Sequence, residues 1–201
     1  MLKRIFDIFL SGLGLIMLSP FFLIMAIWIK LDSKGPVFYR GLRVGLHGKP
    51  FRIFKFRSMV IDAEKNGVAS TSKNDVRVTK VGKFIRKYKI DEFSQLINVF
   101  LGNMSLVGPR PEIQNFVNQY TDEEKIILTV RPGITDFASI KFHNEGEIIA
   151  ASGIENADEA YAKLIRPEKL KLQMKYITEQ NLWLDISLII QTLLKVFLRN
   201  Y

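Results

Sequence analysis

The stretch "KIDEFSQLINVFLGNMSLVGPRPE", residues 89–112, contains side chains that could act together on a phosphate group. Two adjacent carboxylates, Asp91 and Glu92, begin a segment whose apolar residues recur at helical spacing. The cations just upstream are Lys83, Arg86, Lys87 and Lys89. A helix start with cations beside it binds anions and keeps carboxylates ionised. We therefore predict a phosphate-binding site here, with Arg86 among its ligands.

The two carboxylates can have different roles because neighbouring helical residues diverge by about 100°. One could attack phosphorus, as in enzymes that form an aspartyl phosphate. The other could hold a divalent cation that bridges phosphates and offsets charge in the transition state. The alternative interpretation is structural: Asp91 caps the helix and Glu92 complements the helix dipole.

Arg110 lies between Pro109 and Pro111 in a Gly-Pro-Arg-Pro turn. The proline rings restrict the backbone on both sides, so the guanidinium can contact a phosphate oxygen with little loss of chain entropy. We predict that Arg110 binds substrate phosphate. The alternative is a plain stop signal after the preceding helix.

Aromatic and β-branched runs broken by Gly and Pro predict a β-hairpin near residues 37–58. In its second strand Ile53, Lys55 and Arg57 share one face by the period of two. Two cations spaced by roughly 7 Å suit a diphosphate or a phosphate-bearing surface, so Lys55 and Arg57 are further candidates for substrate-phosphate binding. A solvated edge with protective charges is the alternative.

Composition excludes several other kinds of chemistry. The 201 residues include no cysteine, which rules out disulfides and thiolate sites, and the two histidines, His47 and His143, lie in no zinc or triad motif. The net charge is +9, and residues 34–89 carry 15 Lys and Arg against three acidic residues. A block this basic favours an anionic partner: a nucleic acid, an acidic lipid surface or a phosphorylated small molecule.

A membrane segment is predicted at the N-terminus. Residues 8–29 are 22 consecutive uncharged positions, flanked by Lys3, Arg4 and Lys30, and about 20 apolar residues suffice to cross a bilayer. Proline in the Ser19-Pro20 pair removes a helical hydrogen bond near the middle, and the serine hydroxyl can satisfy part of the freed backbone. Cations at both ends suit a helix that enters, bends and returns to one face, although a simple span also fits the pattern.

The remaining chain is predicted to be mainly helical. Helices are predicted near 79–88, 91–101, 112–119, 155–165 and 167–179. Residues 182–199 have a polar stripe on an apolar helix, which suits either the membrane interface or docking on the core. "VRPGIT", residues 130–135, places Pro and Gly at the centre of a predicted type II turn.

The chain resembles the bacterial sugar transferase family, the monotopic polyprenyl-phosphate phosphoglycosyl transferases. The resemblance rests on "KRIFD" (3–7), "SP" (19–20), "FKFRSM" (54–59), residues 89–112 and "VRPGIT", in order through the whole chain. It implies the small, catalytic-unit form. Residues 1–33 would be a re-entrant membrane helix bent at Ser19-Pro20. Residues 34–201 would be a compact cytoplasmic α+β catalytic domain that ends in an interfacial amphipathic helix near 182–199.

The resemblance also implies an activity. Members move a phospho-sugar from a UDP-sugar to undecaprenyl phosphate and release UMP, the first membrane step in building a cell-surface glycan. Asp91 would be the nucleophile that carries a covalent phospho-sugar, Glu92 would support Mg²⁺ binding, and Arg110 would contact phosphate. The expected location is the cytoplasmic face of the bacterial inner membrane, in contact with its lipids through Lys3, Arg4, Ser19 and Pro20.

One departure from the family pattern concerns the sugar. Many members have Gly-Trp-Ala-Gln after "GIT", whereas this chain has Asp136-Phe137-Ala138-Ser139, so the identity of the sugar stays open. Two other functions are also considered: a membrane glycosyltransferase that releases UDP, and a membrane-tethered module that binds anions without catalysis. Nucleic acid is not an expected partner, because no nucleic-acid motif accompanies the basic block.

Overall fold

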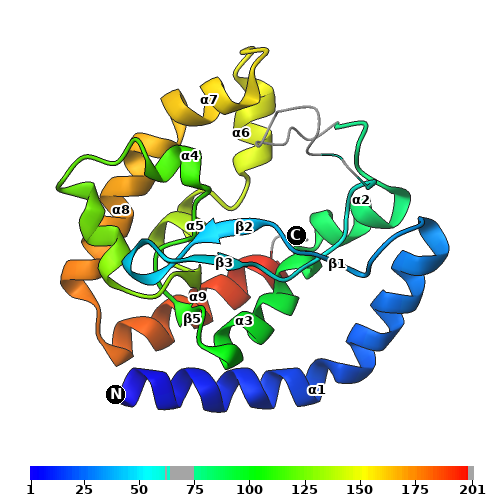
Figure 1. Ribbon diagram of the computed structural model, residues 1–201, viewed down its shortest axis with the longest axis horizontal. Coiled ribbons are helices and arrows are strands. Elements are labelled where there is room, and N and C mark those ends of the chain that lie inside the picture. Colours follow the sequence, from blue (N-terminus) through cyan, green and yellow to red (C-terminus); the bar gives the residue numbers. More distant parts are fainter. Residues whose placement is uncertain (62, 64–74, 199–201) are drawn as a thin grey trace.

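The computed structural model describes residues 1–61, 63 and 75–198. Helices dominate these residues, and three small two-stranded sheets lie among them. Figure 1 shows the longest helix, α1, along one edge, with the remaining helices and the short strands gathered on one side of it. The predicted fold class, mainly helical with a small β component, is confirmed.

Helix α1 (Leu2–Asp32) is long and apolar enough to cross a membrane, with a mean hydropathy of 2.3 over its most apolar 18 residues. It is continuous through Pro20 but bends, so that its second half turns toward α2 (Figure 1). The hydroxyl of Ser19 donates to the carbonyl of Ile16 at 2.8 Å. That carbonyl is the one that Pro20, lacking an N–H, cannot serve, so the predicted repair by the serine is confirmed.

Both ends of α1 bind the rest of the protein. At the start, Arg4 donates to the carbonyl of Val99 at 2.6 Å, and Asp7 accepts from the backbone N–H of Leu106 at 3.0 Å. At the other end, Asp32 accepts from the N–H of Val81 at 3.1 Å. Because the helix is tied at both ends, the fold sets its position relative to α2, α3 and β5.

The predicted hairpin at 37–58 forms as two short antiparallel ladders. Strand β1 (Phe38–Tyr39) pairs with β4 (Lys55–Phe56), and β2 (Leu42–Val44) pairs with β3 (Pro50–Arg52) across the tip η1 (Leu46–Gly48). Between β3 and β4 the side chain of Asn98 replaces a partner strand: it accepts from the N–H of Phe54 at 2.7 Å and donates to the carbonyl of Arg52 at 2.9 Å. This interruption turns the chain before Lys55.

The helices after the hairpin match most of the prediction. They are α2 (Lys80–Lys87), the 3-10 helix η3 (Ile90–Gln95), α3 (Leu96–Leu101), α4 (Gln114–Val117), the 3-10 helix η4 (Glu124–Thr129), α5 (Phe137–Lys141), α6 (Glu145–Ala151), α7 (Ala157–Leu164), α8 (Arg166–Glu179) and α9 (Leu182–Leu198). The predicted helix at 112–119 is a single turn, and α5 and α6 were not predicted. The end of the helix predicted over 182–199, Arg199, lies outside the described residues.

Strands β5 (Ser105–Val107) and β6 (Gly133–Thr135) form a parallel pair that the sequence did not predict. The type II turn predicted for "VRPGIT" is wrong, because Gly133 lacks the positive φ of that turn and belongs to β6. Its role is close packing: a Cβ on Gly133 would lie 2.1 Å from the backbone nitrogen of Gly108. The pairing places the chain that follows β5, which carries Arg110.

Replacing Gly133 by alanine tests this packing. Because the new methyl group meets backbone, which cannot rotate away, Gly133→Ala is expected to destabilise the protein by about 1–3 kcal/mol. Gly153→Ala is the matched control: Gly153 has a φ of +71° but nothing within 4 Å of its Cβ position, so it carries only backbone strain. Thermal unfolding in detergent compares the two. Equal losses of stability would contradict the close-packing account.

Candidate active site

The Asp91–Glu92 pair lies in η3, not at the start of an α-helix. Lys89, just before it, has left-handed backbone geometry with φ of 57°, which reverses the chain after α2. No side chain caps η3, so the interpretation of Asp91 as a capping residue is wrong. The hydroxyl of Ser94 donates to the backbone carbonyl of Asp91 at 3.1 Å and holds the turn.

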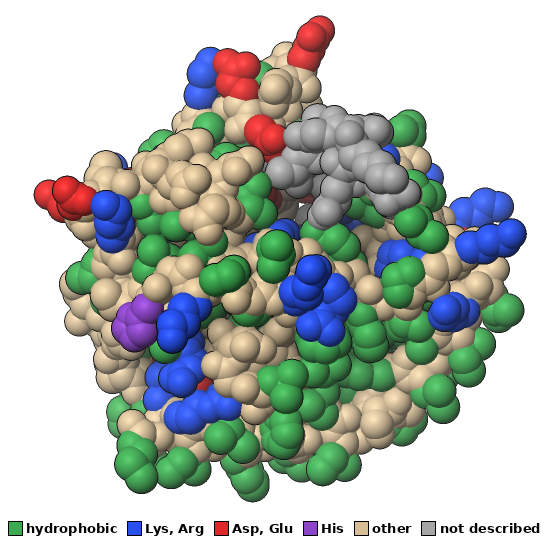
Figure 2. Space-filling model, viewed as in Figure 1, with side chains coloured by type: hydrophobic (Ala, Val, Ile, Leu, Met, Phe, Trp, Pro, Cys, Tyr) green, Lys and Arg blue, Asp and Glu red, His purple; other side chains and the backbone are tan. Residues whose placement is uncertain are grey.

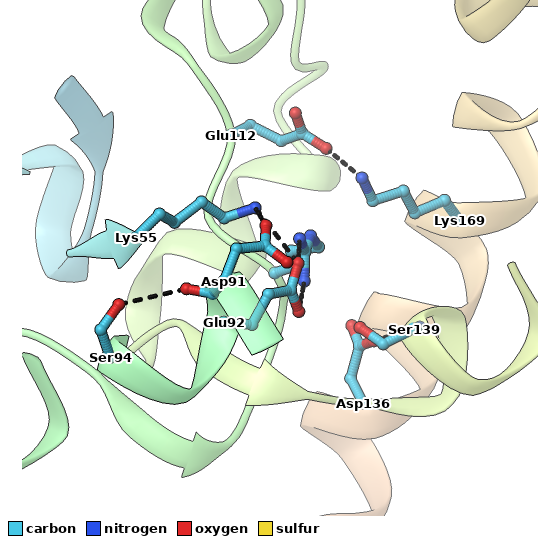
Figure 3. Close-up of polar contacts among 9 residues, drawn as sticks. Lys55, Asp91, Glu92, Ser94, Glu112, Asp136, Ser139 and Lys169 are labelled. Atoms are coloured by element: carbon cyan, nitrogen blue, oxygen red, sulfur yellow. Dashed lines mark hydrogen bonds and ion pairs between the residues drawn. The ribbon is translucent and has the colours of Figure 1, made fainter. Parts of the chain in front are cut away.

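Four predicted site residues come together around this turn. The Nζ of Lys55, from β4, lies 3.3 Å from Oδ2 of Asp91 and 3.2 Å from Oε1 of Glu92 (Figure 3). The guanidinium of Arg110 makes a two-pronged ion pair with Glu92, with its Nη1 3.0 Å from Oε2 and its Nη2 on Oε1. Lys55 therefore bridges both carboxylates, while Arg110 binds Glu92.

The charges in this cluster affect one another strongly. Burial alone raises the pKa of Glu92, but the neighbouring cations Arg110 and Lys55 outweigh it and hold that pKa well below its usual range. Glu92 in turn raises the pKa of Arg110. Burial lowers the pKa of Lys89. Glu92 is therefore an ionised carboxylate neutralised by two cations, as expected for groups that meet a charged ligand.

One carboxylate oxygen of Asp91 has no partner among the described residues. Its side chain is only 12% exposed, and Oδ1 is buried with no hydrogen-bond partner among the described residues. An unsatisfied buried acceptor costs about 1–3 kcal/mol, so each such atom calls for an explanation. This oxygen is free to bond to a ligand atom.

A row of buried side chains on α8 holds the segment that carries Arg110. Lys169 forms an ion pair with Glu112 at 2.6 Å, and Gln173 donates to the backbone carbonyl of Arg110 at 3.4 Å. Tyr176 donates to the carbonyl of Val107 at 3.2 Å. Positions 169, 173 and 176 follow helical spacing, so one face of α8 supports residues 107–112.

The Glu112–Lys169 pair includes a third group. The hydroxyl of Tyr161 accepts from Lys169 at 2.8 Å and donates to Glu112 at 2.6 Å. Burial raises the pKa of Glu112, but Lys169 outweighs it and the net shift is downward. Sequence reasoning missed these supporting residues, although the polar positions 169, 173 and 176 at i, i+4 and i+7 in a predicted helix were a usable signal.

Arg57 and Arg86 are not brought to the pair of carboxylates. Arg57 is buried and donates to the backbone carbonyls of Ser33 and Lys34, both at 2.6 Å, beyond the end of α1. Lys55 and Arg57 therefore have different partners, and of the two only Lys55 contacts the carboxylates. Arg86 has a buried Nη1 without a partner in the described part of the chain.

Asp136 and Ser139, where the chain has Asp-Phe-Ala-Ser after "GIT", are drawn in Figure 3 apart from the cluster around Asp91, and no contact joins them to it there. Asp136 is fully buried and caps α5 by accepting from the backbone N–H of Ser139 at 2.6 Å. Its second oxygen, Oδ2, and the hydroxyl of Ser139 have no partner among the described residues. The visible role of Asp136 is thus to start α5.

The carboxylates of the site can be compared with the ligands that the predicted Mg²⁺ would need. Among the described residues no three Asp, Glu or His side chains gather closely enough to hold a metal alone. Mg²⁺ is commonly bound by only one or two carboxylates together with substrate phosphates and water. Glu92 fits that pattern as a single carboxylate ligand.

Comparison with known proteins identifies the family of this chain. A family model described as "Bacterial sugar transferase" matches residues 1–199. The chain belongs to the bacterial sugar transferase family. The predicted resemblance is therefore confirmed over nearly the full chain.

Several curated relatives of this sugar transferase carry names that state a reaction. A UDP-glucose:undecaprenyl-phosphate glucose-1-phosphate transferase of Klebsiella pneumoniae is 37% identical over 98% of this chain and 40% of its own length. A UDP-N-acetylgalactosamine-undecaprenyl-phosphate N-acetylgalactosaminephosphotransferase of Aeromonas hydrophila is 37% identical over 96% of this chain and 43% of its own. The chain thus spans about two fifths of the length of these relatives.

A relative of similar size is the "uncharacterized sugar transferase EpsL" of Bacillus subtilis. It is 34% identical over 97% of this chain and 87% of its own length. The matched region therefore also occurs in a protein with little sequence outside it.

The support given by α8 can be tested at Lys169. Lys169→Met leaves Glu112 buried without its cation, which is expected to cost about 3–5 kcal/mol of unfolding free energy. Glu112→Gln combined with Lys169→Met removes both charges and should recover much of that loss. Unfolding measurements in detergent compare the variants.

Lys163→Met is the matched control. Lys163 forms an exposed ion pair with Glu159 on α7, and exposed pairs contribute about 1 kcal/mol or less. If Lys169→Met is no more damaging than Lys163→Met, the proposed support of residues 107–112 by α8 is wrong.

Proposed function

We propose that this chain transfers a sugar 1-phosphate from a UDP-sugar to undecaprenyl phosphate through a covalent intermediate on Asp91, and releases UMP. The observation that carries the proposal is the Asp91–Glu92 pair held by Lys55 and Arg110, in a member of the bacterial sugar transferase family. The named relatives, which act on UDP-sugars and undecaprenyl phosphate, support the substrate classes.

In the first step a carboxylate oxygen of Asp91 attacks the β-phosphorus of the UDP-sugar. A bond forms between that oxygen and phosphorus, and the bond from this phosphorus to the oxygen bridging to the α-phosphate breaks. UMP leaves with the bonding electrons, and Asp91 carries the phospho-sugar. The unpaired Oδ1 supports this assignment because it needs to give up no hydrogen bond.

In the second step a phosphate oxygen of undecaprenyl phosphate attacks the same phosphorus. The bond between Asp91 and phosphorus breaks, the carboxylate is restored, and the lipid diphosphate sugar forms. The acceptor is already anionic near neutral pH, so no strong general base is required. This agrees with a cluster built from Lys55, Arg110 and two carboxylates without histidine.

Arg110 and Lys55 are positioned to bind phosphate oxygens. Both cations contact Glu92, so a diphosphate enters a site that already holds two compact, oriented positive charges. Arg86 has an unpaired buried Nη1 and stays a candidate for the same role. Glu92 would hold Mg²⁺, which when bound neutralises charge on the diphosphate.

For the membrane we propose that α1 enters and leaves the lipid on the cytoplasmic face, bent at Ser19-Pro20. The support is that both ends of α1 bind the same unit: Arg4 and Asp7 hold α3 and β5, and Asp32 holds α2. A straight 31-residue helix extends about 46 Å, yet one compact unit contacts both its ends. Exposed apolar side chains along α1 meet the lipid.

Asp91→Asn tests the covalent mechanism directly. The parent protein, mixed with UDP-sugar, Mg²⁺ and undecaprenyl phosphate in detergent, is expected to release UMP, and without acceptor its mass should rise by one phospho-sugar. Asp91→Asn should lose both signals, with turnover lower by at least about a thousandfold. Chelating Mg²⁺ should also stop UMP release.

Asp122→Asn is the matched control, because the side chain of Asp122 is 97% exposed and its substitution should leave turnover unchanged. Release of UDP in place of UMP would identify a glycosyltransferase. Binding of UDP-sugar with no turnover by the parent would identify a non-enzymatic module. Either result, or full turnover by Asp91→Asn, overturns the proposal.

The proposed path of α1 can be tested with single cysteines because the chain has none. Leu2→Cys and Lys34→Cys each place one cysteine at or just beyond an end of α1. Both positions are exposed. A membrane-impermeant thiol reagent is expected to label both in inverted vesicles and neither in right-side-out vesicles. Labelling from opposite sides would show a helix that crosses the bilayer once.

A further inference from the structure

A second cavity lies apart from the Asp91–Glu92 pair. It has a volume of about 340 Å³, and none of Lys55, Asp91, Glu92 and Arg110 lines it. Its walls come from the start of α1, the tip of the β2–β3 hairpin, β5, the chain before β6 and the end of α8. Ligand pockets begin at about 300 Å³, so the space is large enough for a small charged group.

Two arginines of this cavity converge on the end of α3. Arg4 donates to the carbonyls of Val99 and Phe100 at 2.6 and 3.0 Å, and Nε of Arg131 donates to the carbonyl of Gly102 at 3.0 Å. Bonds to neighbouring carbonyls place the two guanidiniums close together. Among the described residues neither arginine forms an ion pair with a carboxylate.

The charge of the cavity is positive on balance. Lys3, Arg4 and Arg131 line it with a single carboxylate, that of Asp7. Asp7 is buried and accepts from a backbone N–H, and Lys3 is paired with Asp185. The charge of Asp7 offsets part of the charge of Arg4, so the charge left without a counter-ion is chiefly that of Arg131, whose donor geometry suits phosphate.

Apolar surface adjoins this charge. On α1, Leu2 and Phe9 are 66% and 68% exposed, and Trp183 in the first turn of α9 is 82% exposed. In Figure 2, Lys and Arg side chains gather near the start of α1, directly above apolar side chains along the lower edge of the face. Cations next to exposed apolar and tryptophan side chains are typical of the headgroup level of a membrane.

We propose that this cavity binds the phosphate headgroup of an anionic glycerophospholipid, with Arg131 and Arg4 as its ligands. A lipid fits better than a free phosphate because the acyl chains can lie against the exposed apolar side chains of α1. The site is separate from the acceptor's site of reaction, and it does not rest on the proposed transfer chemistry.

Arg131→Gln tests the proposal while keeping a donor for the carbonyl of Gly102. Native mass spectrometry of the full chain in detergent, titrated with phosphatidylglycerol, measures lipid binding. The parent should bind phosphatidylglycerol more tightly than phosphatidylcholine, and Arg131→Gln should weaken the former about tenfold. Arg52→Gln is the matched control, since Arg52 is also exposed and donates to one backbone carbonyl, that of Arg40 at 3.0 Å.

Thermal unfolding of each variant accompanies the titration, and Arg131→Lys, which keeps the charge, should retain most of the binding. Unchanged phosphatidylglycerol binding by folded Arg131→Gln overturns the proposal, as does an equal loss in Arg52→Gln. Displacement of the lipid by equimolar inorganic phosphate shows a free-phosphate site, which also overturns it.

Discussion

The ion pair between Arg110 and Glu92 joins two segments on which the candidate site depends. Glu92 lies in η3, and Arg110 follows β5, so the pair links the turn after α2 to the small parallel sheet. Removing two charges from water costs several kcal/mol for each ion. Two hydrogen bonds from one guanidinium and a third contact from Lys55 offset that cost. The carboxylate and both cations are thereby held in place before any ligand arrives.

This arrangement depends on support behind Arg110. Three side chains on one face of α8, Lys169, Gln173 and Tyr176, contact residues 107–112. The two glycines of the parallel pair, Gly108 and Gly133, let the strands approach closely. The flanking prolines restrict the backbone of Arg110 further. In the proposed function, substrate binding therefore loses little conformational entropy in this segment. A site that is already ordered binds its ligand more tightly for that reason.

Helix α1 is built into the same framework. Its first turns bind α3, β5 and α9, and its last turns pack Met25 and Ile29 into a core with Phe56 and Ile85. Phe56 follows Lys55 directly, so the chain that contacts the carboxylates also contacts α1. In the proposed function, a site anchored to α1 keeps a fixed height relative to the lipid, which suits a reaction between a soluble donor and a lipid-bound acceptor.

Local signals in the sequence were enough to predict the long apolar helix, the serine that repairs the backbone at Pro20, the hairpin and the types of the site residues. Each of these features depends on neighbouring residues or on a motif, so it can be predicted without knowing the fold. The 3-10 turn at Asp91, the fate of Arg57 and the support from Lys169 depend on contacts between residues far apart in the chain. The cations at 55 and 57 show the difference. Their spacing predicts one shared face. In the structure Asn98 interrupts the ladder before them, and Arg57 donates to a backbone carbonyl beyond the end of α1. Sequence determined which charged groups the site needed, and tertiary structure decided which of them meet, because a buried charge goes to whichever partner the packed backbone brings within reach.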